Sequence, residues 1–156
     1  MKQKKRIIKT IVKENKSVGK DHFVLRVIDP YISKIAAAGQ FVNIKVNENY
    51  DFDPLLRIPL GIHRLRKNET SFLYKVVGRG TSILSGKRKG DKIDILGPLG
   101  KGFDTKTQSV KEKALLIAGG HGIAPLYALA EQLLKEKKEV IFFIGACEKK
   151  HVIFRK

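Results

Sequence analysis

The sequence has little of what builds disulfide-bonded, metal-binding or membrane-spanning proteins. Its 156 residues include 1 cysteine, 5 prolines and no tryptophan. The lone cysteine, Cys147, forms no internal disulfide and cannot by itself ligate an iron–sulfur cluster. The longest uncharged stretch, 114–130, is interrupted by glycines and a proline and is too short to cross a bilayer. We therefore expect a cytoplasmic protein without a membrane span.

Catalytic constellations are lacking as well. No serine, histidine and aspartate stand in a defensible triad arrangement, and the histidines are scattered without metal-ligand spacing. The histidines are His22, His63, His121 and His151. We therefore predict no catalytic residue and no metal site.

Acidic residues are scarce relative to basic ones. The chain has 32 lysines and arginines against 15 aspartates and glutamates, which gives a formal net charge of +17 at pH 7. Such a charge attracts polyanions, including nucleic acids, acidic proteins and phosphorylated cofactors. The basic residues are dispersed, however, and base-reading proteins favour arginine over lysine. We do not expect nucleic acid as the main partner, but a basic β-barrel that binds nucleic acid stays open as an alternative.

The first hundred residues contain about six short apolar stretches separated by turn residues. The predicted strands are 7–13, 22–28, 41–46, 55–63, 70–77 and 91–96. The segment 97–100, Gly-Pro-Leu-Gly, is expected to end the sixth strand. Short strands at regular spacing favour a closed antiparallel barrel, because closure removes exposed strand edges. We assign the barrel domain to residues 1–104.

The pattern changes after the barrel. A polar linker precedes the apolar run 114–118, which is typical of a parallel strand buried on both faces. A glycine turn, a predicted helix over 124–135 and a second apolar strand over 140–145 follow. Two strands cannot cover all their faces and edges. The segment 112–156 is therefore predicted to be a partial parallel α/β nucleotide-binding unit.

Two glycine-rich turns are candidate phosphate sites. The first along the chain contains Gly78, Gly80 and Thr81, and Arg79 adds charge. The second, 119–122 with the sequence Gly-Gly-His-Gly, joins a strand to a helix, where free backbone amides favour phosphate. Each turn can equally be a tight structural connection, with Thr81 or Ser82 as a helix cap.

Five segments follow one another in a characteristic order. They are Gly39–Val42, Leu56–Ile62, Leu73–Thr81, Gly97–Phe103 and Ala118–Leu126. In sequence and order they resemble the ferredoxin-NADP reductase superfamily, and within it the electron-transfer subunits of NAD-linked dihydroorotate dehydrogenases. The resemblance covers essentially the whole chain and implies a six-stranded FAD-binding barrel followed by an NAD-binding α/β domain.

The resemblance also implies a function. Electrons would pass between NAD(H) and a partner dehydrogenase through FAD. The partner would be an FMN-containing catalytic subunit that oxidises dihydroorotate in pyrimidine biosynthesis, within a hetero-oligomer. Members of this family hold a [2Fe-2S] cluster on C-terminal cysteines that this sequence lacks.

Site residues follow from the same resemblance. The FAD-binding residues would be Arg57, Ile58, Pro59, Leu60, Gly61, Leu73, Tyr74, Lys75, Gly80 and Thr81. The nicotinamide nucleotide would lie near Gly119, Gly120 and Gly122. The family's flavin motif is Arg-Pro-x-Ser, and Ile58 and Gly61 occupy its arginine and serine positions. A bulge near Pro59 would let Arg57 replace the missing arginine and reach the pyrophosphate.

Two alternatives accompany this hypothesis. The small subunit of an NADH-dependent ferredoxin:NADP reductase has an Arg-Ile-Pro-Leu run like residues 57–60, and it shares the fold and FAD. The other alternative is a remnant that folds but binds little, in which the strand over 140–144 would be an exposed edge that needs a partner.

Overall fold

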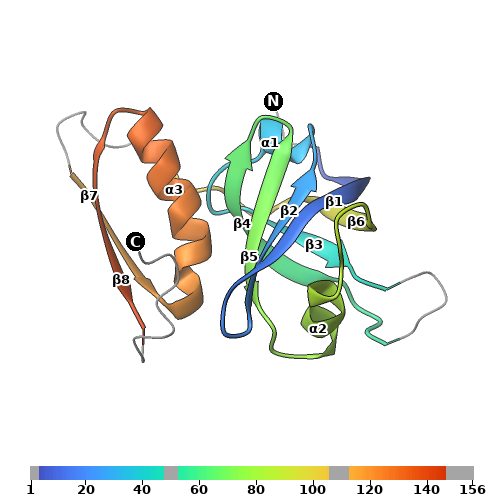
Figure 1. Cartoon of the computed structure of the whole chain (residues 1–156). Helices are drawn as coiled ribbons and strands as arrows, with labels where there is room; N and C mark the ends of the chain where they lie inside the picture. The colour runs from blue at the N-terminus through green and yellow to red at the C-terminus, as the bar shows by residue number, and fades with distance from the viewer. Residues whose placement is uncertain (1–3, 48–52, 106–112, 147–156) are drawn as a thin grey trace.

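The computed structural model describes residues 4–47, 53–105 and 113–146. Figure 1 shows a barrel with a smaller α/β unit beside it. The barrel elements are β1 (Arg6–Gly19), β2 (His22–Ile28), α1 (Ile32–Ile35), β3 (Phe41–Lys45), β4 (Ile58–Arg66), β5 (Glu69–Lys75), α2 (Arg79–Ser85) and β6 (Lys92–Leu99). The α/β unit contains β7 (Lys113–Gly119), the 3₁₀ turn η1 (Gly120–Gly122), α3 (Ile123–Lys135) and β8 (Glu139–Gly145). No helix in these described ranges is long and apolar enough to cross a membrane.

The six barrel strands close in the order β1-β2-β5-β4-β3-β6, and every pairing is antiparallel. Closure depends on the long strand β1, which pairs with β2 along one side and with β6 along the other. The predicted six-stranded antiparallel barrel is therefore confirmed. Its interior is a single apolar cluster to which all six strands contribute.

The predicted ends of several strands are wrong. β1 continues to Gly19 rather than ending at residue 13, and β4 continues to Arg66 rather than ending at residue 63. β4 begins at Ile58 rather than at residue 55, and Leu55 and Leu56 before it are 75% and 78% exposed. β6 does not stop at Gly97 but continues to Leu99. A Cβ at Gly97 would lie 2.7 Å from Cγ1 of Val42, so glycine there permits the close approach of β3 to β6 rather than ending the strand.

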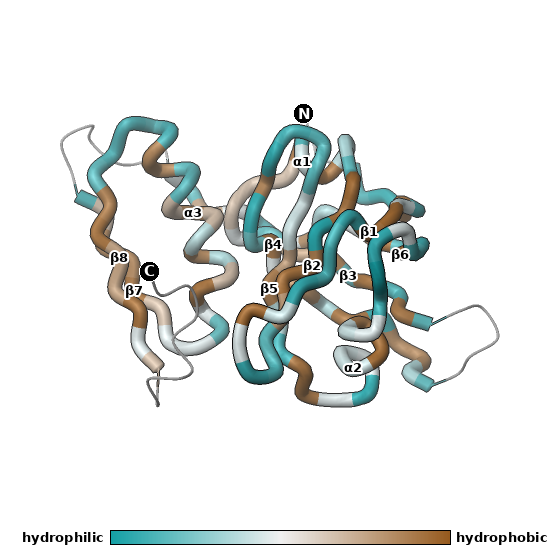
Figure 2. The backbone as a smooth tube through the Cα atoms, viewed as in Figure 1, coloured by the Kyte–Doolittle hydropathy of each residue, from teal (hydrophilic) through white to brown (hydrophobic). Residues whose placement is uncertain are grey.

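The α/β unit is a parallel two-stranded sheet with α3 on one face, as Figure 1 shows. Leu116 on β7 packs against Ala128, Leu129 and Leu133 of α3. The prediction that the strand at 114–118 is buried on both faces is wrong. Ile117, which points away from α3, is 70% exposed. Figure 2 shows how hydrophobic this pair of strands is.

Helix α3 joins the two units. His63 of β4 lies with its Nδ1 3.3 Å from the carbonyl oxygen of Ala124, and its ring centroid is 4.8 Å from that of Tyr127. Next to it, Arg64 forms an ion pair with Glu131 at 2.8 Å and donates a hydrogen bond to the hydroxyl of Tyr127. The barrel therefore presents one side of β4 to one face of α3.

Candidate functional site

The first glycine turn folds as the start of helix α2. Gly78 is the N-cap with extended backbone, and Thr81 stands at the third helical position, not at the cap where we predicted it or Ser82. The Thr81 hydroxyl oxygen accepts hydrogen bonds from the amides of Val77 at 3.0 Å and Gly78 at 3.2 Å. The same hydroxyl donates to the carbonyl of Gly78 at 2.9 Å. Thr81 therefore fixes the shape of the turn from inside.

This turn lies against the first residues of β4. A Cβ at Gly80 would be 2.7 Å from Cδ1 of Ile58, so the two segments touch and glycine is required for their approach. In contrast, a Cβ at Gly61 or Gly78 would meet no heavy atom within 4 Å. The residues predicted for flavin binding on β4 and on the turn therefore come together beside open space.

Arg57 does not point toward the glycine turn. Its Nη1 lies 2.7 Å from a carboxylate oxygen of Asp94 on β6. The pairing of β3 with β4 is regular from Ile58 to Gly61, and the irregularity in β4 falls between Ile62 and Arg64. The predicted bulge near Pro59 is therefore wrong, and Arg57 is engaged in holding two barrel strands together.

The side chains of β5 divide between the two cores. Tyr74 points into the barrel and donates a hydrogen bond to Oδ1 of Asn15 at 3.1 Å. Burial raises the pKa of its hydroxyl to about 12. Leu73 points the other way and packs against Ala118 and Ile123 of the α/β unit. Lys75, at the end of β5, remains partly exposed.

The second glycine turn lies over that end of β5. The ring of His121 is 4.9 Å, centroid to centroid, from the ring of His22 on β2. Burial lowers the pKa of His121, with smaller contributions from His22 and Lys75. Nδ1 of His22 donates to the carbonyl of Lys20 at 2.6 Å, which leaves Nε2 as the acceptor in the neutral ring. No pattern in the sequence signals this pair of histidines, because they are brought together by tertiary packing alone.

The three glycines of the second turn are open to solvent. A Cβ at Gly119, Gly120 or Gly122 would meet no heavy atom within 4 Å. Gly120 has a φ of +51°, which favours glycine. The second turn thus lies over the end of β5 where the barrel meets the α/β unit, and the first turn, which lies against the start of β4, follows that same end of β5 along the chain.

A metal site is not found in the described part of the chain, where no three histidine, cysteine, aspartate or glutamate side chains are grouped suitably for an ion. Cys147 and His151 lie outside the described residues. Leu60 is buried in the barrel, whereas Pro59 is exposed. The accessible groups at this end are therefore mainly backbone amides, Pro59 and the Lys75 ammonium.

The chain is similar to curated proteins of one kind, although no family model matches it. It is 33% identical over 145 residues to the dihydroorotate dehydrogenase B (NAD(+)) electron transfer subunit of Fusobacterium nucleatum, covering 92% of this chain and 55% of the relative. It is 40% identical over 147 residues to the subunit of the same name from a Geobacillus strain, covering 93% of this chain and 56% of the relative. The chain therefore spans about half the length of the curated relatives it matches.

Solved structures of similar fold agree with this sequence similarity. An NADH-dependent reduced ferredoxin-NADP oxidoreductase, studied for electron bifurcation, superposes with a TM-score of 0.77 at 31% identity, over 94% of this chain and 51% of that one. Phthalate dioxygenase reductase superposes with a TM-score of 0.73 at 16% identity, over 95% and 46% of the two chains, and shows the fold alone. The barrel, the strand–turn–helix unit and the sequence agree: the chain has the fold of ferredoxin-NADP reductase-type proteins, and over more than nine-tenths of its length it is similar to electron transfer subunits of dihydroorotate dehydrogenase B.

Proposed function

We propose that this chain is an electron-transfer flavoprotein that passes electrons between NAD(H) and a partner dehydrogenase through FAD. The observation that carries the proposal is the similarity, at 33% and 40% identity over more than nine-tenths of the chain, to proteins named as electron transfer subunits. The domain division at residues 104 and 112 is part of this proposal, since it separates a flavin unit from a nicotinamide unit.

The barrel end has the features that a flavin nucleotide requires. The turn at Gly78–Thr81 is held in shape by the Thr81 hydroxyl, and open space lies over Gly61 and Gly78. We assign the pyrophosphate to the turn at Gly80 and Thr81, with Lys75 as the cation beside it. Because Leu60, Leu73 and Tyr74 are buried, their contribution would come from strand backbone and packing rather than from exposed side chains.

The second turn suits a nicotinamide nucleotide. Its glycines are open, and it precedes α3, whose first amides favour phosphate. Bound FAD would supply the chemistry that links hydride donation by NADH to one-electron transfer. The chain's own residues would hold and orient the two nucleotides, and the packing of His121 against His22 fixes the second turn on the barrel.

The proposed partner is the catalytic subunit of an NAD-linked dihydroorotate dehydrogenase, in a hetero-oligomer that serves pyrimidine biosynthesis. A second candidate is the small subunit of an NADH-dependent ferredoxin:NADP reductase, which the 31% identical structure favours. Both candidates use the same flavin site and differ in the protein that receives the electrons. Reduction of a dihydroorotate dehydrogenase catalytic subunit or of a ferredoxin would separate them.

The test is an absorption spectrum of the purified chain after incubation with FAD and removal of free flavin. Flavin bands that comigrate with the protein, and bleach when NADH is added without oxygen, are the expected result. A protein that stays colourless would overturn the proposal for this chain.

Two variants sharpen the test because they block the proposed sites without disturbing the fold. Gly61→Val and Gly119→Val place side chains in open space at backbone angles that valine tolerates. We expect Gly61→Val to lose FAD and Gly119→Val to keep FAD but lose bleaching by NADH. Ser17→Val, at an exposed strand position, is the matched control and should behave as the parent chain.

A third variant tests the departures from the family's flavin motif. Ile58→Arg combined with Gly61→Ser restores the arginine and serine of that motif. We expect FAD affinity to rise about tenfold, since a charge-assisted contact to phosphate is worth on the order of 1.5 kcal/mol or more. An unchanged affinity would mean that the flavin, if bound, does not lie along β4.

A further inference from the structure

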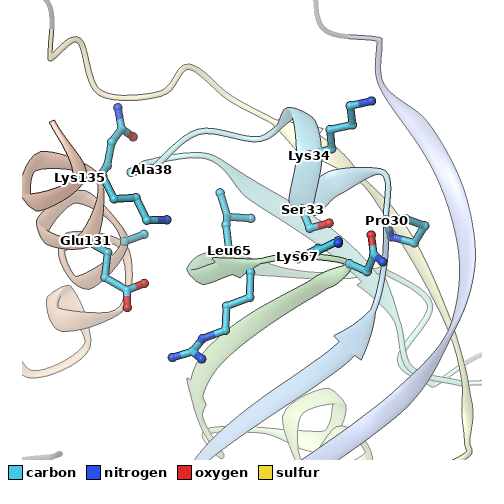
Figure 3. Close-up of a pocket in the computed structure, with 12 residues that line it drawn as sticks. Pro30, Ser33, Lys34, Ala38, Leu65, Lys67, Glu131 and Lys135 are labelled. Carbon is cyan, nitrogen blue, oxygen red and sulfur yellow. The ribbon is translucent and has the colours of Figure 1, made fainter.

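A groove opens at the end of the molecule opposite the glycine turns. Strand β5 runs between the two ends, from Glu69 near the groove to Lys75 near the glycine turns. Helix α1, the turn that joins β4 to β5, and helix α3 form the walls, and the volume is about 560 Å³ (Figure 3). None of the residues proposed above for FAD or nicotinamide lines it.

The groove is basic on every side. Lys34 comes from α1, Arg66 from the end of β4, Lys67 from the turn that follows it, and Lys135 from the last turn of α3. Figure 3 shows Lys135 extending from α3 toward Leu65, and the Lys67 amine lying beside Ser33 of α1. Cations thus enter from both the barrel and the α/β unit.

These four cations have no ion-pair partner within the described ranges, where no carboxylate lies within 4.0 Å of any of them. The groove has one acidic side chain in its lining, Glu131. That carboxylate is already paired with Arg64, outside the groove, by two contacts of 2.8 Å. The lining therefore keeps a net positive charge, although Arg66 stands opposite Glu69 in the β4–β5 ladder.

Neutral groups complete the lining in a way that favours an anion. Leu65 and the buried Ala38 give an apolar floor, which lowers the local dielectric and strengthens the field of the surrounding cations. Ser33 and Asn68 add hydrogen-bonding groups at the barrel wall. The volume lies within the range of small-molecule sites, about 300–1,000 Å³.

We propose that this groove binds a compact polyanion, a small molecule that carries several phosphate or carboxylate groups. Because its cations come from both units, a bound polyanion would connect Lys67 of the barrel to Lys135 of α3. Binding therefore holds the α/β unit against the barrel and stabilises the folded chain by mass action. The site is independent of flavin and does not rest on the electron-transfer proposal.

The experiment follows the thermal unfolding of the full chain while pyrophosphate, ATP or citrate is added at constant ionic strength. We expect a saturable rise in Tm with at least one of these probes. A rise in Tm with pyrophosphate or ATP but not with citrate identifies a phosphate ligand. A rise with citrate but not with the two phosphates identifies a carboxylate ligand. Either result supports the site. The absence of a saturable rise with all three probes overturns the proposal, and so does an equal rise when sodium chloride of matched ionic strength replaces the probe.

Two double variants test whether the active probe binds in the groove. Lys67→Gln combined with Lys135→Gln should weaken the active probe about tenfold or more, because each removes a charge-assisted contact. Lys9→Gln combined with Lys89→Gln removes the same charge at exposed positions outside the groove and should leave the affinity unchanged. Equal weakening in both double variants would show a general charge effect and overturn the proposal. A shift produced by a polyglutamate peptide but by none of the small probes would overturn it in favour of an acidic protein surface.

Discussion

The barrel buries the inner faces of six strands and leaves no unpaired edge, whereas the α/β unit buries one face of two strands and exposes the other. The exposed face is apolar, and in register it presents Leu115 beside Ile141 and Ile117 beside Phe143. The barrel therefore contains its own core, while the unit's order depends on α3 and on the contact of α3 with β4. The predictions below test this difference.

Loss of the barrel core has the largest expected effect. Phe72 is fully buried at the centre of the barrel cluster, and Phe72→Ala is expected to cost about 3–5 kcal/mol of unfolding free energy. Leu133→Ala, in the small cluster under α3, should loosen that unit and leave the barrel intact. Amide hydrogen exchange measured segment by segment distinguishes the two. Equal loss of protection in both units after Leu133→Ala would contradict the comparison.

Acidification is expected to weaken the contact between the units. Burial lowers the pKa of His63 to about 4 from its ordinary 6.5, with a smaller opposing effect from the Ala124 carbonyl. The unfolded chain therefore takes up the proton first as the pH falls. The stability that the neutral ring contributes is complete above pH 6.5 and is lost as the pH drops toward 4.

Between pH 7 and pH 5 that loss amounts to about 2 kcal/mol. Urea unfolding at a series of pH values measures it, and His63→Gln is the control, since it removes this titration and keeps the others. If the parent and the variant show the same pH dependence, His63 does not titrate at the contact between units.

The ion pair at the same contact has a smaller expected effect. Arg64 and Glu131 are each 28% exposed, so solvent screens their attraction, and their coupling is expected to be about 1 kcal/mol or less. A double-mutant cycle with Arg64→Gln and Glu131→Gln measures it. Arg64 also stacks over the Tyr127 ring at 4.6 Å, so Arg64→Gln alone should cost more than Glu131→Gln alone. The reverse order would show that the carboxylate, not the ring, positions the arginine.

The exposed sheet face should contribute least to stability. Ile117→Thr with Phe143→Thr removes apolar groups that are 70% and 58% exposed. We expect a change within about 0.5 kcal/mol in unfolding free energy. Self-association measured by light scattering should fall, because the apolar patch is smaller. A large loss of stability would mean that this face is already covered in solution.

The sequence was sufficient to predict the barrel, but it was not sufficient to predict several details of the candidate site. Turn residues between stretches of alternating apolar and polar residues marked the six strands. A close approach such as that of Gly97 to Val42 is visible only in three dimensions. An apolar run such as 114–118 has the same sequence pattern whether the strand is covered on one face or on both faces. This is why the predicted burial of Ile117 was wrong.

At the candidate site, glycines 78, 80, 119, 120 and 122 marked the turns, but only two of these five have a visible reason for glycine: Gly80 lies against Ile58, and Gly120 has a φ of +51°. The direction of Arg57 depended on strand register, and its partner Asp94 lies on another strand with no local signal. The contact of His22 with His121 likewise joins two units that sequence patterns treat separately.

The double pairing of β1 has a consequence for how the chain is made. Arg6 pairs with Gly97, so β1, which is made before the other barrel strands, must wait for β6 before the barrel can close. Until β6 has emerged, β1 and β3 both present open edges to other nascent chains. Contacts so distant in sequence form slowly. The interval before closure is therefore when this chain most needs protection by chaperones.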